Sequence, residues 1–185
     1  MYINRDIIQK LIEQYSQPKI FSCSYEISED EYDRIKSSQK NGRAHDVTLY
    51  IKKDDKYIVI AKHFYPQGLF RAPSGGINVG EDFIEGAKRE VLEETGCQVE
   101  IKKFLLQTHV QFQQIDSDKS IDWHSYVFLA EYISGDFKFT DKNEIREVAV
   151  VPLEKFDQFS KTMRATSIGG LHYRADLHDA VKELL

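Results

Sequence analysis

The sequence has few cysteines, few prolines and no long apolar run. Its 185 residues include 2 cysteines and 4 prolines. Cys23 and Cys97 lie too far apart to form a metal-ligand motif, and so low a count is typical of reduced thiols in a cytosolic protein. No stretch approaches the roughly 18 apolar residues that a membrane-spanning helix needs. We therefore expect a soluble, cytoplasmic protein that has no membrane partner.

Internal repeats, low-complexity segments and a basic charge balance are also absent. The formal net charge is -5, with 25 Lys and Arg against 30 Asp and Glu. This balance disfavours a general nucleic-acid binder, which needs many cationic contacts to phosphates. A nucleotide ligand stays open, because a bound divalent cation can reverse the local sign of the charge.

Periodicity divides the chain into a short N-terminal segment and a larger unit. Residues 1–43 contain an apolar helical stripe, an alternating strand and a capping box, and they end in a polar stretch with Asn-Gly. We assign them as an N-terminal extension, part of or packed on the main domain at residues 44–185.

The main domain reads as strands on both sides of one central helix. Two β-rich runs around KKDDK predict a hairpin, and VEIKKFLLQTHVQFQQ with WHSYVFLAEY predicts a larger one. GDFKF and REVAVVP are expected to be two further strands, followed by a helix that starts at Pro152 and a C-terminal helix. The resulting prediction is an α+β fold, an α/β/α sandwich with a mixed β-sheet.

The most informative stretch is GGINVGEDFIEGAKREVLEETGC, residues 75–97. A helix is predicted from about Asp82 to Thr95, with Gly96 as its stop signal. Within it, three glutamates project beside the apolar stripe, within an arc of about 100°. These are Glu90, Glu93 and Glu94.

Two interpretations of these glutamates are open. Taken alone, the three carboxylates suit an ordinary solvated surface helix. Their crowding also suits a hard cation such as Mg²⁺, which favours carboxylate and water oxygens. Gly75 and Gly76 favour the metal interpretation, because a glycine loop lets the backbone approach a ligand or metal closely.

The spacing of the whole stretch resembles the Nudix box, G-x5-E-x7-R-E-U-x-E-E-x-G-U, where U is a bulky apolar residue. A chance match of its fixed residues is expected on the order of 10⁻⁷ for a chain of this length. The order of strands and helices also resembles the Nudix fold. The residues that fit the box are Gly75, Glu81, Arg89, Glu90, Val91, Glu93, Glu94 and Gly96, with Cys97 at the last apolar position.

The resemblance implies an enzyme that hydrolyses a nucleoside diphosphate linked to another group X, using water and divalent cations. It implies that Glu90 and Glu94 are the principal metal ligands and that Glu93 is a third ligand or a general base. Arg89 is implied to orient these carboxylates, and Glu85 is spaced to pair with Arg89. The implied cofactor is Mg²⁺, with Mn²⁺ as the other candidate.

Two candidate site residues lie outside the box. Glu144 in DKNEIREV is our candidate for a catalytic base on a later loop, as in several Nudix enzymes, with Glu147 second. An exposed loop charge is the alternative for Glu144. Arg71, just before the glycine loop, either holds a substrate phosphate or pairs with a carboxylate. We include it with Gly75 and Gly76 as a substrate-binding residue.

The expected function is a Nudix-type nucleotide pyrophosphohydrolase with a small nucleotide substrate. The proline that usually follows the box in ADP-ribose hydrolases is absent, which leaves nucleoside triphosphates and nucleotide sugars as stronger candidates than ADP-ribose-like substrates. The alternative is a non-catalytic nucleotide sensor on the same fold. Sensors usually lose a box glutamate, and this chain keeps all of them. A homodimer is left open.

Overall fold

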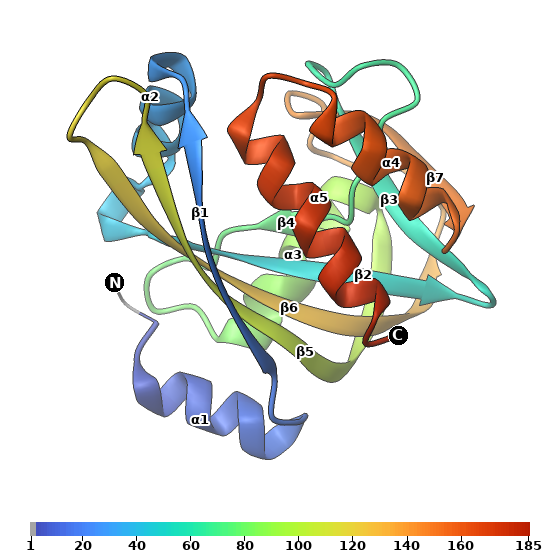
Figure 1. Cartoon of the computed structure of the whole chain (residues 1–185). Coiled ribbons are helices and arrows are strands. Elements are labelled where there is room, and N and C mark those ends of the chain that lie inside the picture. The colour runs from blue at the N-terminus through green and yellow to red at the C-terminus, as the bar shows by residue number, and fades with distance from the viewer. Residues whose placement is uncertain (1–2) are drawn as a thin grey trace.

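The computed structural model describes residues 3–185 as a mixed β-sheet with helices on both faces (Figure 1). The helices are α1 (Arg5–Gln14), α2 (Glu29–Ser38), α3 (Phe83–Thr95), α4 (Lys155–Arg164) and α5 (Gly169–Lys182), and a short 3-10 turn, η1, spans Lys40–Gly42. The strands are β1 (Lys19–Ile27), β2 (His45–Lys53), β3 (Lys56–Lys62), β4 (Ser74–Gly75), β5 (Cys97–Gln114), β6 (Ser120–Gly135) and β7 (Ile145–Pro152). The predicted α+β sandwich with a mixed sheet is confirmed.

The strands of the sheet follow the order β1–β5–β6–β2–β3–β7, and the short β4 pairs with β2. β2–β3 and β5–β6 are antiparallel, which confirms both predicted hairpins, whereas β1–β5 and β2–β6 are parallel. β1 belongs to the segment predicted as an extension, yet it pairs with β5 along residues 19–27. The N-terminal segment is therefore built into the main sheet, and the boundary at residue 43 stays a prediction.

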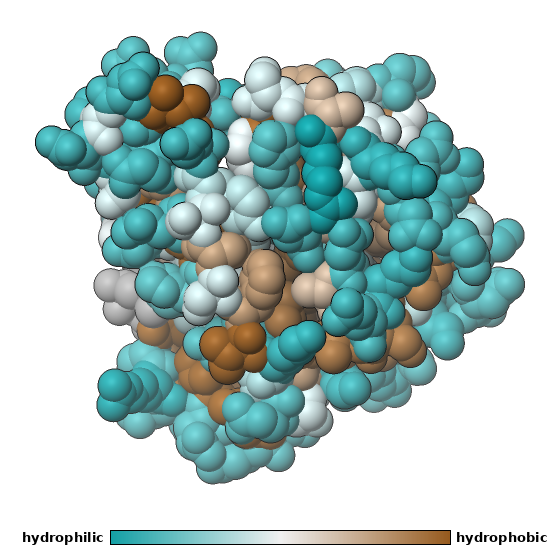
Figure 2. Space-filling view, viewed as in Figure 1, coloured by the Kyte–Doolittle hydropathy of each residue, from teal (hydrophilic) through white to brown (hydrophobic). Residues whose placement is uncertain are grey.

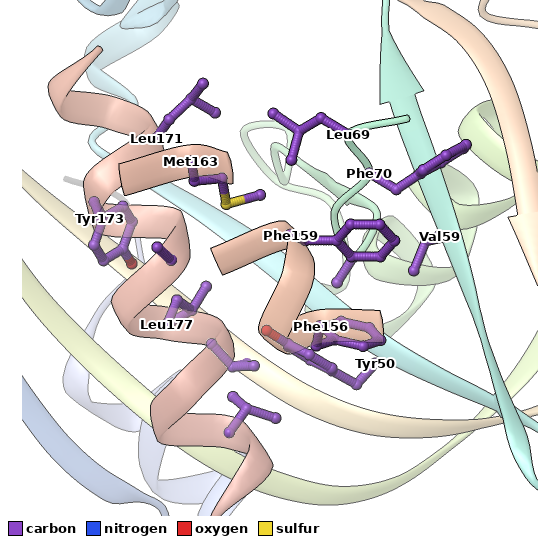
Figure 3. Close-up of a cluster of buried hydrophobic side chains, with 14 of the residues drawn as sticks. Tyr50, Val59, Leu69, Phe70, Phe156, Phe159, Met163, Leu171, Tyr173 and Leu177 are labelled. Carbon is purple, nitrogen blue, oxygen red and sulfur yellow. The ribbon is translucent and has the colours of Figure 1, made fainter. Parts of the chain in front are cut away.

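Each face of the sheet has its own apolar core. Alternate residues of a strand point to opposite faces, so β2 sends Leu49 to the face covered by α1 and α3 and Tyr50 to the face covered by α4 and α5. Figure 3 shows the second core, where Tyr50 and Phe156 lie together beside Phe159 and Leu177. Figure 1 shows α4 and α5 in front of the sheet and α3 behind it. This arrangement anchors α3, the helix of the box, against the sheet.

Two predicted elements are wrong. GDFKF does not form a separate strand: Gly135 is the last residue of β6, and Phe137 has a φ of 62°, which lies outside the range that strands use. There the chain passes so close to Gly96 that a Cβ added to Gly96 would lie 2.7 Å from the backbone nitrogen of Lys138. Pro152 does not start a helix, because it is the last residue of β7, and α4 begins later at Lys155.

The surface seen in Figure 2 is mainly hydrophilic. Among residues 3–185, no helix combines the length and the apolar character needed to cross a bilayer.

His178 on α5 is a buried histidine inside the second core. Its side chain contacts the rings of Tyr50 and Phe156 edge-on, with ring centroids 6.0 and 4.9 Å away. Among the residues that the structure describes, its Nδ1 has no hydrogen-bond partner. Burial lowers the pKa of His178 to about 3, and three arginines add to this shift. They are Arg174, Arg71 and Arg164.

We expect His178 to weaken the fold in acid. Its folded-state pKa lies below the unfolded value of about 6.5, so its full stability contribution is present above pH 6.5 and is lost as the pH falls toward 3. At pH 5 the expected loss is about 2 kcal/mol of unfolding free energy. Urea unfolding at pH 7.5 and pH 5 should show a smaller acid loss in His178→Leu than in the wild type. Equal losses in the two proteins would contradict this assignment. The variant keeps some acid sensitivity, because burial also lowers the pKa of His45, to about 4.

Candidate active site

Helix α3 places the box glutamates beside the sheet. It begins after Asp82, whose side chain accepts hydrogen bonds from the backbone N–H groups of Ile84 and Glu85 at 3.0 and 3.1 Å. It ends at Gly96, which has φ 71°, as the sequence predicts. The helix therefore covers the predicted span to within one residue.

The three glutamates of the box differ in exposure. Ala87 and Val91 are buried against the sheet, and Glu94, on the same side of the helix, is only 3% exposed. The Glu90 side chain is 19% exposed and the Glu93 side chain 45%. They therefore do not form one uniformly solvated acidic face, which disfavours the interpretation as an ordinary surface helix.

Arg89 binds the carboxylates around it through its planar fork. Its Nε and Nη2 donate to the two carboxylate oxygens of Glu81 at 2.7 and 2.9 Å. Its Nη1 donates to Glu90 at 2.9 Å and to Glu93 at 3.2 Å. These contacts support the predicted orienting role of Arg89. Hydrogen bonds from Arg89 are the largest cause that lowers the pKa of Glu81 to about 2.

The predicted pairing of Glu85 with Arg89 is wrong. Glu85 accepts a hydrogen bond from Lys88 at 2.9 Å instead. The guanidinium of Arg89 donates hydrogen bonds to Glu81, Glu90, Glu93 and the carbonyl of Gly76.

The glycine loop approaches the glutamates through its backbone. The N–H of Ser74 donates to Glu94 at 2.8 Å, and the N–H of Gly76 donates to Glu90 at 3.2 Å. A Cβ added to Gly75 would lie 1.9 Å from a carboxylate oxygen of Glu90. Only glycine therefore leaves room for the carboxylate at this position, as expected for a loop that approaches its ligand closely.

The pKa values of Glu90 and Glu94 are both raised. Burial raises the pKa of Glu94 to about 7, against the lowering effect of Arg71 and Lys62, and the negative charge of Glu90 raises it further. Burial also raises the pKa of Glu90, against hydrogen bonding from Arg89. A nearby cation would stabilise the ionised forms of the buried Glu94 and the partly buried Glu90, which repel each other.

The residues present fit a hard divalent cation. Mg²⁺ is usually held by one or two carboxylates while it keeps water and substrate phosphate oxygens as its other ligands. Glu90 and Glu94 form such a pair. Within residues 3–185, no three His, Cys, Asp or Glu side chains already converge at metal-binding spacing. Glu93, the third predicted ligand, is hydrogen-bonded to Arg89.

A cleft of about 970 Å³ brings most of the predicted site residues together. Arg89 and Glu93 do not line it. The predicted site residues that do are Arg71, Gly75, Gly76, Glu90, Glu94 and Glu144.

Glu144 reaches this cleft from the turn before β7. It forms an ion pair with Lys62 at the end of β3. The positive charge of Lys62 is the main cause that lowers the pKa of Glu144, which keeps this carboxylate ionised at neutral pH. Glu147, the second candidate, is exposed on β7 and does not line the cleft. The structure therefore favours Glu144 as the candidate base.

Arg71 is a buried partner of Glu94. Its side chain is 3% exposed, and its Nη2 lies 3.6 Å from a carboxylate oxygen of Glu94. It also donates to Tyr65 Oη at 3.1 Å and to Ser74 Oγ at 2.8 Å. Of the two interpretations left open, the structure has Arg71 paired with a carboxylate. Phosphate binding by Arg71 stays a prediction.

Several cleft residues are not among the predicted site residues. Arg174 on α5 forms an ion pair with Asp46 on β2 and donates to Ser74 Oγ at 3.3 Å. These partners are 128 and 100 residues away in the chain, and no local pattern reveals such contacts. Arg43 and Trp123 also line the cleft, and the sequence marks neither as part of a charged site.

Comparison with known proteins places the chain in one family. The model of the NUDIX domain matches residues 42–168. Nudix hydrolase 6 of Arabidopsis thaliana is 30% identical over 111 residues, which cover 57% of this chain and 37% of that protein. An ADP-ribose pyrophosphatase of Methanocaldococcus jannaschii is 33% identical over 92 residues, which cover 49% of this chain and 52% of that protein.

The chain thus spans about a third to a half of the length of these two relatives. Among solved structures, a NUDIX hydrolase from Nitrosomonas europaea superposes with a TM-score of 0.54 at 20% identity, covering 73% of this chain and 89% of that chain. At this identity the likeness establishes the fold alone. The domain match covers the box, the glycine loop and most of the sheet, and the chain belongs to the NUDIX domain family.

Proposed function

We propose that this protein is a nucleotide pyrophosphohydrolase that depends on a divalent cation, Mg²⁺ or Mn²⁺. Its substrate would be a nucleoside diphosphate linked to another group, as in a nucleoside triphosphate, a nucleotide sugar or an ADP-ribose-like compound. The observation that carries the proposal is the meeting of Glu90, Glu94 and Glu144 in one cleft beside the loop at Gly75 and Gly76. The family match supports pyrophosphate hydrolysis in general.

Different residues would bind the cation and position its ligands. Glu90 and Glu94 would hold the cation, which, when bound, neutralises phosphate oxygens and lowers the pKa of an attacking water. Arg89 fixes Glu90 through a hydrogen bond and connects it to Glu81 and the carbonyl of Gly76. The geometry of Glu90 is therefore set before the substrate arrives.

Glu144 would accept the proton of the attacking water. A general base must be unprotonated at the working pH, and the ion pair with Lys62 meets this condition. Glu93 stays a candidate third ligand or base, but its bond to Arg89 and its position outside the cleft favour Glu144.

The alternative, a nucleotide sensor without catalysis, has less support. The box keeps all of its glutamates, and Glu90 and Glu94 both line the cleft. A sensor would need neither a paired carboxylate site nor an ionised base.

A hydrolysis screen tests the proposal. The purified chain would be incubated with nucleoside triphosphates, nucleotide sugars, ADP-ribose and dinucleoside polyphosphates, each with Mg²⁺, with Mn²⁺ and with EDTA. We expect cleavage of at least one class with a cation and none with EDTA. Tight nucleotide binding without cleavage of any class would favour the sensor instead.

A further inference from the structure

Some of the arginine and lysine side chains that line the cleft form ion pairs with carboxylates of the described residues, and others do not. Those that pair with a carboxylate are Lys62 with Glu144, Arg71 with Glu94 and Arg174 with Asp46. In the part of the chain that the structure describes, the other cations of the cleft form no ion pair, and these are Arg34, Lys40 and Arg43. A substrate diphosphate needs an uncompensated cation, so the candidates to bind it are in the segment at residues 34–43.

Arg43 is the member of this group that reaches the glycine loop. Arg34 lies over the ring of Phe64, with its guanidinium carbon 5.4 Å from the ring centroid, and Lys40 is exposed. By contrast, a Cβ added to Gly76 would lie 1.7 Å from Nη1 of Arg43. Gly76 also donates its N–H to Glu90. The Arg43 guanidinium therefore lies next to the backbone that contacts the proposed metal ligand.

The guanidinium of Arg43 is held in place by contacts that leave its terminal nitrogens available to a ligand. Its Nε donates to the carbonyl of Ser38 at 3.1 Å, and its central carbon lies 5.9 Å from the ring centroid of Trp123. Among residues 3–185, neither terminal nitrogen of Arg43 donates a hydrogen bond. A planar fork held through Nε and lying over an aromatic ring, with its terminal N–H groups free of protein partners in the described part of the chain, suits bidentate binding of a phosphate.

We propose that Arg43 binds the diphosphate of the substrate and that α2 and η1 hold it at the glycine loop. This inference rests on the proposed function and gives it a phosphate-binding residue in place of Arg71, whose charge is compensated by Glu94. The segment predicted as an extension then supplies part of the binding site as well as a strand of the sheet.

The test compares Arg43→Gln with Lys36→Gln. Each variant removes one positive charge from residues 29–43, but Lys36 is exposed and does not line the cleft. We expect Arg43→Gln to raise the Kd for ADP with Mg²⁺ about 10- to 100-fold in calorimetry, as lost hydrogen bonds to a charged group predict. Lys36→Gln should stay within about twofold of the wild type. Arg43→Lys should recover only part of the affinity, because lysine lacks the planar fork.

Trp123 offers a second readout, because it is the only tryptophan of the chain and lies against Arg43. ADP should change its fluorescence in the wild type and much less in Arg43→Gln at the same concentration. Equal ADP affinity in wild type and Arg43→Gln would overturn the proposal, as would the absence of ADP binding by the wild type.

The test separates this inference from the proposed function. If the wild type hydrolyses a nucleotide and Arg43→Gln leaves its KM unchanged, the role of Arg43 is wrong while the enzyme assignment stands. If ADP binding depends on Arg43 and no nucleotide is hydrolysed, the enzyme assignment is wrong while the binding role of Arg43 stands.

Discussion

Glu94→Gln is expected to lower kcat by at least about 100-fold, because changes even to residues behind metal ligands cost about 10- to 100-fold. The substitution removes a carboxylate that lines the cleft with Glu90. Burial raises the pKa of this carboxylate. The amide keeps the shape of the side chain, so we expect the fold to persist. Steady-state kinetics with the best substrate of the screen, together with circular dichroism, would measure both effects.

Glu85→Gln is the matched control for this prediction. Glu85 is on the same helix but is exposed, pairs with Lys88 and does not line the cleft. Its substitution should leave kcat within about twofold, as for most surface changes. If Glu94→Gln and Glu93→Gln both retained wild-type turnover, the assignment of the box carboxylates to catalysis would fail.

Glu144→Gln is expected to lower kcat by about 10²- to 10⁴-fold, the usual contribution of a general base. KM should change much less, because the proposed phosphate contacts come from other residues. The amide cannot accept the proton of water, although it preserves the size of the side chain next to Lys62. Single-turnover kinetics would show whether the loss is in the chemical step.

Glu147→Gln separates a specific role for Glu144 from a general effect of charge. The two glutamates lie three residues apart, but only Glu144 lines the cleft. Wild-type kcat is expected for Glu147→Gln. Similar losses in both variants would argue against Glu144 as the base, and an undiminished kcat in Glu144→Gln would return that role to Glu93.

The sequence predicts the elements whose signals are local. Asp82 and Gly96 mark the ends of α3 through capping and a left-handed turn, so its boundaries follow from adjacent residues. The two hairpins follow from β-rich runs separated by polar turns, and the box spacing predicts Glu90 and Glu94 as site residues, which both line the cleft. Local signals fail where tertiary contacts decide. GDFKF alternates like a strand, but close packing against Gly96 and the positive φ of Phe137 prevent one.

The surroundings of the carboxylates could not be predicted for the same reason. The sequence supports phosphate binding and carboxylate pairing by Arg71 equally. Only the buried position of Arg71 beside Glu94 favours the carboxylate pair. The pairing of Arg174 with Asp46 joins residues that are far apart in the chain. Arg43 reaches the glycine loop because β1 and β2 set the path of the segment between them, a feature of topology that has no periodic signature.

The measurement that tests the central claim most directly follows the oxygen of the attacking water. Wild type and Glu94→Gln would be incubated in ¹⁸O-enriched water with the best substrate of the screen, with Mg²⁺ or with EDTA, and the products analysed by mass spectrometry. We predict one ¹⁸O atom in one phosphate-containing product, formed by the wild type with Mg²⁺ and almost absent with EDTA or in Glu94→Gln. Label incorporation that is equally fast without a divalent cation or without Glu94 would contradict a cation-dependent pyrophosphohydrolase built on these carboxylates.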